Sequence, residues 1–114
     1  MNAQVILKPR PLAGRQIPRH RIDLRVRVTP DGQPTIHCRS NDLNKEGMGL
    51  LLPSDMPIGT RALLEFALPH RLEPLRIRGL LRHREGFRSG FEFVHLTSEE
   101  RHLIRHFCQE LPLR

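Results

Sequence analysis

The chain has 114 residues, enough for one domain with a single modest core and too few for two. It carries 19 lysine and arginine residues against 12 aspartate and glutamate residues, a formal net charge of +7, and only Lys8 and Lys45 are lysines. Arginine binds phosphate and the guanine edge through paired hydrogen bonds, so the excess favours a phosphate-bearing or nucleobase ligand. A coding bias toward arginine explains the same excess without a ligand.

The sequence has no apolar run near the roughly 18 residues of a membrane span, and its start lacks the pattern of a signal peptide. We therefore expect a soluble, cytoplasmic protein. Cys38 and Cys108 are not spaced as a redox or zinc motif, so we expect two buried free thiols. The absence of tryptophan and tyrosine leaves few rings on which nucleic-acid bases could stack.

The first strand is expected to follow an irregular start. Residues 1–14 contain Pro9, Pro11 and Gly14 and no lasting periodicity, which predicts a flexible lead-in before a domain over 15–111. Apolar and polar residues then alternate over 21–28, the period of a half-buried strand.

Further strands are predicted at 35–42, 48–52, 61–68, 75–83 and 87–95, the last two joined by a turn at 84–86. The tail changes to a helical period over 98–110, and Thr97 and Glu100 match a capping box at its start. Short strands with turns at roughly ten-residue spacing favour a closed sheet, because closure removes exposed edges. We predict a mainly β protein, a six-stranded antiparallel β-barrel with one C-terminal helix.

Two polar segments flank the first strands. Arg15 and Arg19 stand four residues apart just before the first strand, and Asp42, Asn44 and Gly47 lie between the second and third. Their order resembles the signature of the PilZ domain family, an RxxxR segment followed by [D/N]xSxxG. The likeness continues through the glycine and phenylalanines of the last hairpin and the start of the helix, and covers about 15–111.

The resemblance implies a six-stranded barrel that binds the bacterial second messenger cyclic di-GMP. Arg15 and Arg19 would then clamp phosphates and stack on or hydrogen-bond guanine, and Asp42 would accept from the N1 and N2 donors of guanine. Asn44 stands where the family has serine and offers both a donor and an acceptor, and Gly47 would allow a tight turn or a close backbone approach.

Other interpretations of these segments stay open. Arg21 directly adjoins the strand and could replace Arg19 as the second motif arginine. The two motifs could also be a solvated basic arm and a turn in which Asp42 or Asn44 caps its own backbone. Arg82–Arg84 and Arg88 make the last hairpin basic, either to support ligand phosphates or as a charged sheet edge that resists aggregation.

The sequence shows no GxSxG, P-loop or HExxH motif, so we expect no enzyme and no cofactor. His102 and His106 are four residues apart near Cys108, but no further ligand completes a zinc site, and we expect no metal.

We predict a non-catalytic receptor of cyclic di-GMP that acts on a partner protein in trans. The first alternative is a PilZ-like interaction module that binds no nucleotide and acts in motility, pilus or envelope assembly. The second is a small basic barrel that binds nucleic acid, and the sequence predicts no specific nucleic-acid site for it.

Overall fold

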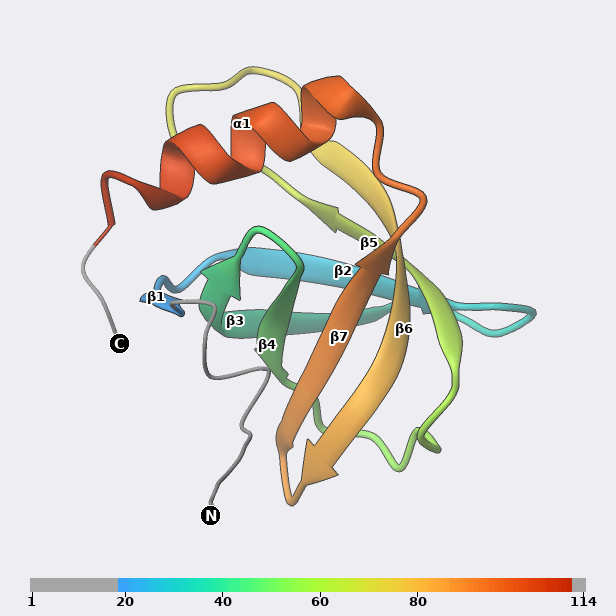
Figure 1. Cartoon of the computed structure of the whole chain (residues 1–114). Helices are drawn as coiled ribbons and strands as arrows, with labels where there is room; N and C mark the ends of the chain where they lie inside the picture. The colour runs from blue at the N-terminus through green and yellow to red at the C-terminus, as the bar shows by residue number, and fades with distance from the viewer. Residues whose placement is uncertain (1–18, 112–114) are drawn as a thin grey trace, which may run out of the picture.

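The computed structural model describes residues 19–111, which form seven strands and one helix (Figure 1). In chain order these are β1 (His20–Arg21), β2 (Arg25–Pro30), β3 (Ile36–Asn44), β4 (Gly47–Leu51), β5 (Arg61–Phe66), β6 (Leu75–Glu85), β7 (Arg88–Val94) and α1 (Ser98–Cys108). The predicted lead-in at 1–14 and Arg15 lie outside the described residues.

Six of the strands close into a barrel, as predicted. Neighbouring strands follow the order β3-β2-β5-β6-β7-β4, and β4 pairs back with β3. All pairings are antiparallel, and β1 is an extra short strand beside β3. Beyond Leu80, β6 pairs with β7 alone, so Arg82 and Arg84 lie on a strand end with one side outside the ladder, and the charged-edge explanation of them stays a prediction.

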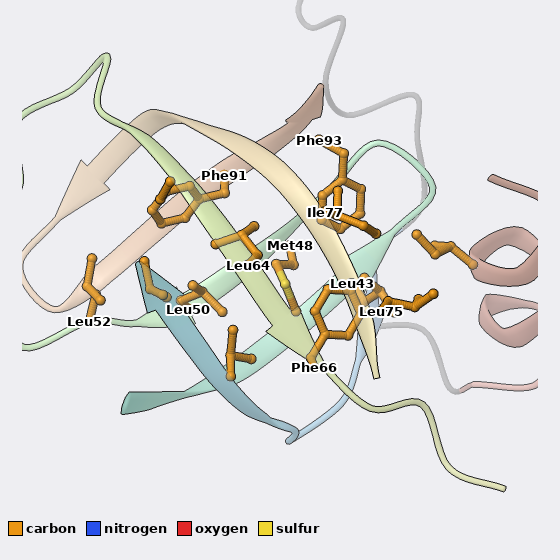
Figure 2. Packing of buried hydrophobic residues seen from close by; sticks show 14 of the residues in the cluster. Leu43, Met48, Leu50, Leu52, Leu64, Phe66, Leu75, Ile77, Phe91 and Phe93 are labelled. Atoms are coloured by element: carbon orange, nitrogen blue, oxygen red, sulfur yellow. The ribbon is translucent and has the colours of Figure 1, made fainter. Parts of the chain in front are cut away.

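The alternation along the strands fills the barrel with apolar side chains (Figure 2). On β6, Leu75, Ile77 and Leu81 are buried while the arginines between them are exposed. The rings of Phe66 and Phe93 stack in the interior with their centroids 6.2 Å apart.

The strand predicted over 21–28 is broken between β1 and β2. At the break, the buried Ser40 hydroxyl accepts from Leu24 N–H and donates to Ile22 C=O, both at 2.8 Å. A side chain thus replaces the ladder hydrogen bonds that an unbroken strand would make. The alternation of apolar and polar residues over 21–28 gives no sign of this break.

The last hairpin also differs from its predicted form. Its turn consists of Gly86 and Phe87, between β6 and β7, rather than residues 84–86. Gly86 has a φ of 62°, which a residue without Cβ adopts at little cost. Phe87 is consequently at the tip and 71% exposed, unlike the core phenylalanines.

Helix α1 lies across one end of the barrel (Figure 1). Thr97 and Glu100 form the predicted capping box, with both reciprocal hydrogen bonds at 3.0 Å. Ile104 and Cys108 are buried against the core. The helix ends at Cys108, two residues before the predicted end, and Gln109 is its C-cap.

Candidate functional site

A bulge in β3 shapes the candidate site. The pairing of β3 with β4 shifts register between Ser40 and Asp42, so Asn41 is an extra residue in the strand. Asn41 and Asp42 consequently both lie beside Gly49 of β4: a Cβ built on Gly49 would be 2.6 Å from Asp42 Oδ1 and 2.7 Å from Asn41 Oδ1. Bulges often redirect side chains in this way at functional sites.

A second bulge lies opposite the first. The pairing of β6 with β7 shifts between Leu81 and His83, which places His83 opposite Gly90. The two bulges border a cleft of about 190 Å³, lined from four strands and the segment before β1 by residues that include Arg19, Asp42, Gly49, His83, Arg88 and Gly90.

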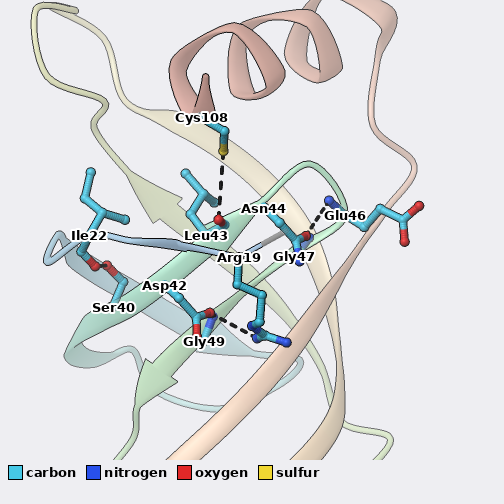
Figure 3. A network of polar contacts seen from close by, with 10 residues as sticks. All are labelled: Arg19, Ile22, Ser40, Asp42, Leu43, Asn44, Glu46, Gly47, Gly49 and Cys108. Carbon is cyan, nitrogen blue, oxygen red and sulfur yellow. Dashed lines mark hydrogen bonds and ion pairs between the residues drawn. The ribbon is translucent and has the colours of Figure 1, made fainter. Parts of the chain in front are cut away.

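Asp42 lines this cleft, and its side chain is only 2% exposed. Its Oδ1 accepts from Gly49 N–H at 2.9 Å and from Arg19 Nη2 at 3.0 Å (Figure 3). The Arg19 side chain is 46% exposed, so it extends from the buried carboxylate toward solvent. A buried carboxylate needs such partners, because its desolvation is otherwise costly.

Asn44 ends β3 and Gly47 begins β4, so they flank the turn between the two strands. Asn44 Oδ1 accepts from the N–H groups of Glu46 and Gly47 at 2.8 and 2.9 Å, so its side chain caps the turn (Figure 3). Gly47 passes so close to β7 that a Cβ would collide with the carbonyl of Phe91. Both residues therefore shape the backbone beside the cleft without lining it.

Of the two alternatives for the second motif arginine, Arg19 is the one that contacts Asp42. Arg21 is exposed in β1 and lines an adjoining groove of about 500 Å³. Asn41 and Arg88 line both the groove and the cleft, so the two depressions adjoin.

Sequence reasoning missed Asn41 and Gly49, and it assigned no definite role to His83. Asn41 reaches the site only because of the bulge, and the strand period over 35–42 carries no sign of one. Gly49 could have been suspected, because it is a glycine inside a predicted strand, a frequent mark of close approach.

A model of the PilZ domain matches residues 14–110 of the chain. The chain belongs to the PilZ domain family. Comparison with curated proteins gave no match.

Three solved structures share the fold of this PilZ domain. The PilZ domain of YcgR from Escherichia coli, described with c-di-GMP, has a TM-score of 0.70 at 18% identity, over 87% of this chain and 92% of that one. The PilZ domain of CeSA from a cellulose-synthesizing bacterium has a TM-score of 0.63 at 17% identity, over 75% and 89%. The inhibitor of motility MotI/DgrA from Bacillus subtilis has a TM-score of 0.69 at 16% identity, over 82% of this chain but 49% of its own length.

The residues considered for a metal site do not converge. The rings of His102 and His106 stack at 6.2 Å on exposed positions of α1, whereas the Cys108 thiol is buried and directed at Leu43 C=O, 3.9 Å away. Within residues 19–111, no three potential ligands are grouped suitably for a metal ion.

Burial raises the pKa of both Cys38 and Cys108 to about 11, so each remains a protonated, weakly nucleophilic thiol at neutral pH. The described part of this PilZ domain contains no helix with the length and apolarity of a membrane span.

Proposed function

We propose that this PilZ domain is a non-catalytic receptor that binds cyclic di-GMP in the Asp42 cleft and passes the signal to a partner protein. The observation that carries the proposal is the buried Asp42 carboxylate, held by Gly49 N–H and Arg19 in a cleft bordered by two bulges. The presence of c-di-GMP in the related YcgR domain supports the choice of ligand.

The chemistry of guanine fits this arrangement. Its N1–H and N2–H groups are adjacent donors, which a carboxylate accepts, and its O6 and N7 acceptors suit a guanidinium. The base would displace Arg19 from Asp42 Oδ1, and Arg19, with Arg15 preceding it, would turn to the base or a phosphate. Asn44 lies beside the cleft rather than in its wall and has its carbonyl committed to the turn, so only its amide NH₂ would be left to reach toward the ligand.

The size of the cleft indicates which part of the ligand it would hold. At about 190 Å³ it is smaller than the roughly 300 Å³ at which pockets for drug-sized ligands begin. One guanine would occupy it, and the rest of the dinucleotide would lie over the adjoining groove beside Arg21 and Arg88. Those two guanidinium groups are then the expected phosphate contacts.

Isothermal titration calorimetry with cyclic di-GMP tests the proposal, with GTP as the control ligand. We expect saturable binding by the wild type, and Arg19→Ala and Asp42→Asn to weaken it by about ten- to a hundredfold, since a hydrogen bond to a charged group contributes roughly 1.5–3 kcal/mol. Arg61→Ala, which removes an exposed strand arginine outside the cleft, should bind as the wild type does.

One observation favours a second candidate, a protein-interaction module without nucleotide: the motif residue Asn44 is engaged in capping the turn. In that case cyclic di-GMP would give neither heat nor a thermal shift, and Arg19→Ala would leave the biological activity unchanged. Absence of wild-type binding would refute the receptor function.

A further inference from the structure

A second depression lies on the outer face of the barrel, across β2, β3 and β5. This groove, here called the β2–β5 groove, has a volume of about 470 Å³. Its charged and apolar walls include Arg25, Arg27, Arg39, Glu65, Ala67 and Pro74. Neither Arg19 nor Asp42 lines it, so it is separate from the candidate ligand cleft.

Two arginines lie side by side on adjacent strands of this groove. Arg25 of β2 is the direct cross-strand partner of Arg39 of β3. Arg39 is held by a bidentate pair with Asp23, at 2.7 and 3.0 Å, which also lowers the pKa of Asp23. Arg25 has no ion-pair partner among the residues that the structure describes. Like charges directly opposite one another destabilise a sheet, so the fold gains nothing from a cation at position 25.

The chemistry of the walls favours a protein over a polyphosphate. Ala67 and Pro74 offer apolar contact, to which the methylene stems of the arginines add. Glu65 contributes a carboxylate on the same face, 3.9 Å from Arg27 and 3.1 Å from Arg76. A nucleic-acid backbone would meet that carboxylate with unbroken negative charge, whereas a peptide can place an apolar side chain beside it.

We propose that the β2–β5 groove docks an acidic segment of a partner protein, in which apolar side chains alternate with carboxylates. The carboxylates pair with Arg25 and Arg27, and the apolar side chains contact Ala67 and Pro74. Arg39 lines both this groove and the groove beside the ligand cleft, so the two binding surfaces adjoin along β3. Docking does not require that the cleft bind cyclic di-GMP.

The test measures binding and stability on the same variants. The binding probe is a fluorescein-labelled peptide of alternating glutamate and leucine, followed by fluorescence anisotropy, with a lysine–leucine peptide and a DNA duplex as comparison probes. We expect the glutamate–leucine peptide to bind, and the double variant Arg25→Glu plus Arg27→Glu to weaken it by at least about tenfold. The control variant Arg61→Glu replaces an exposed strand arginine that lies outside the groove. It should bind the peptide nearly as well as the wild type does.

Thermal unfolding measures a second property, the stability, which should change in the opposite direction to the peptide affinity. The single variant Arg25→Glu places a negative charge opposite Arg39 in the sheet, where the wild type has two positive charges. Its melting temperature should therefore rise at low salt while its peptide affinity falls. Tighter binding of DNA than of peptide, no saturable peptide binding by the wild type, or equal binding by the double variant would each overturn the proposal.

Discussion

Two buried serines occupy the same level of the barrel, on either side of Leu50 in the strand register. Ser40 makes two hydrogen bonds to the backbone, whereas Ser89 Oγ is buried with no hydrogen-bond partner among residues 19–111. Removing Ser40 Oγ leaves Leu24 N–H and Ile22 C=O unpaired, so Ser40→Ala should lower the free energy of unfolding by about 1–3 kcal/mol. Ser89→Ala removes a group that gains nothing in the interior and should leave stability equal or higher. Urea denaturation distinguishes them, and an equal loss in both variants would contradict this account.

At the residue scale, the order of motif residues assigned Arg19 and Asp42 to one site, but it did not predict the ion pair between them and left the structural roles of Asn44 and Gly47 open. Gly47 is needed because β7 passes close to it, and Asn44 caps the turn, as the non-ligand interpretation of the motif proposed. Asn41 could not be assigned, because alternation alone places consecutive strand residues on opposite faces, and only the bulge brings Asn41 beside Asp42.

At the element scale, the start of α1 offers the clearest test of a local signal. Thr97 Oγ1 accepts from Glu100 N–H at 3.0 Å and satisfies one of the unpaired donors of the first turn. Thr97→Ala should therefore lower the free energy of unfolding by about 1 kcal/mol, and Thr97→Ser, which keeps the hydroxyl, should retain most of it. The measurement is chemical denaturation followed by circular dichroism. Equal loss in the two variants would show that the methyl group, not the cap, is responsible.

Elements whose signals are local were predicted well, and those decided by distant contacts were not. The alternation over 75–83 and the capping box both describe what forms there. The break after β1 depends on Ser40, which is distant in sequence, and the hairpin turn is set by the bulge that shifts β6 against β7. Neither the Ser40 hydrogen bonds nor this bulge changes the alternation of apolar and polar residues from which the strands were predicted.

At the scale of the whole molecule, closure of the barrel distributes the charge around the surface. Arginines on several strands pair with carboxylates of other segments, as in Arg39–Asp23, Arg78–Asp31 and Arg84–Asp55. Within residues 19–111 these arginine charges are thus interrupted by carboxylates rather than joined in one continuous basic stripe. Binding of a long polyanion requires such a stripe, and a dinucleotide requires only one cleft.

This contrast predicts how ligand binding responds to salt. A nucleic-acid complex with six to ten phosphate contacts loses about 10³–10⁵ in affinity between roughly 50 and 200 mM salt, because condensed counterions are released on binding. Cyclic di-GMP has two phosphates and no condensed ion atmosphere, so its affinity should fall by no more than about tenfold over that range. Calorimetric titrations at several salt concentrations, with a DNA duplex titrated in parallel, measure both slopes. A steep slope for the dinucleotide, or a DNA affinity above it at physiological salt, would show that the overall charge, and not the Asp42 cleft, governs binding.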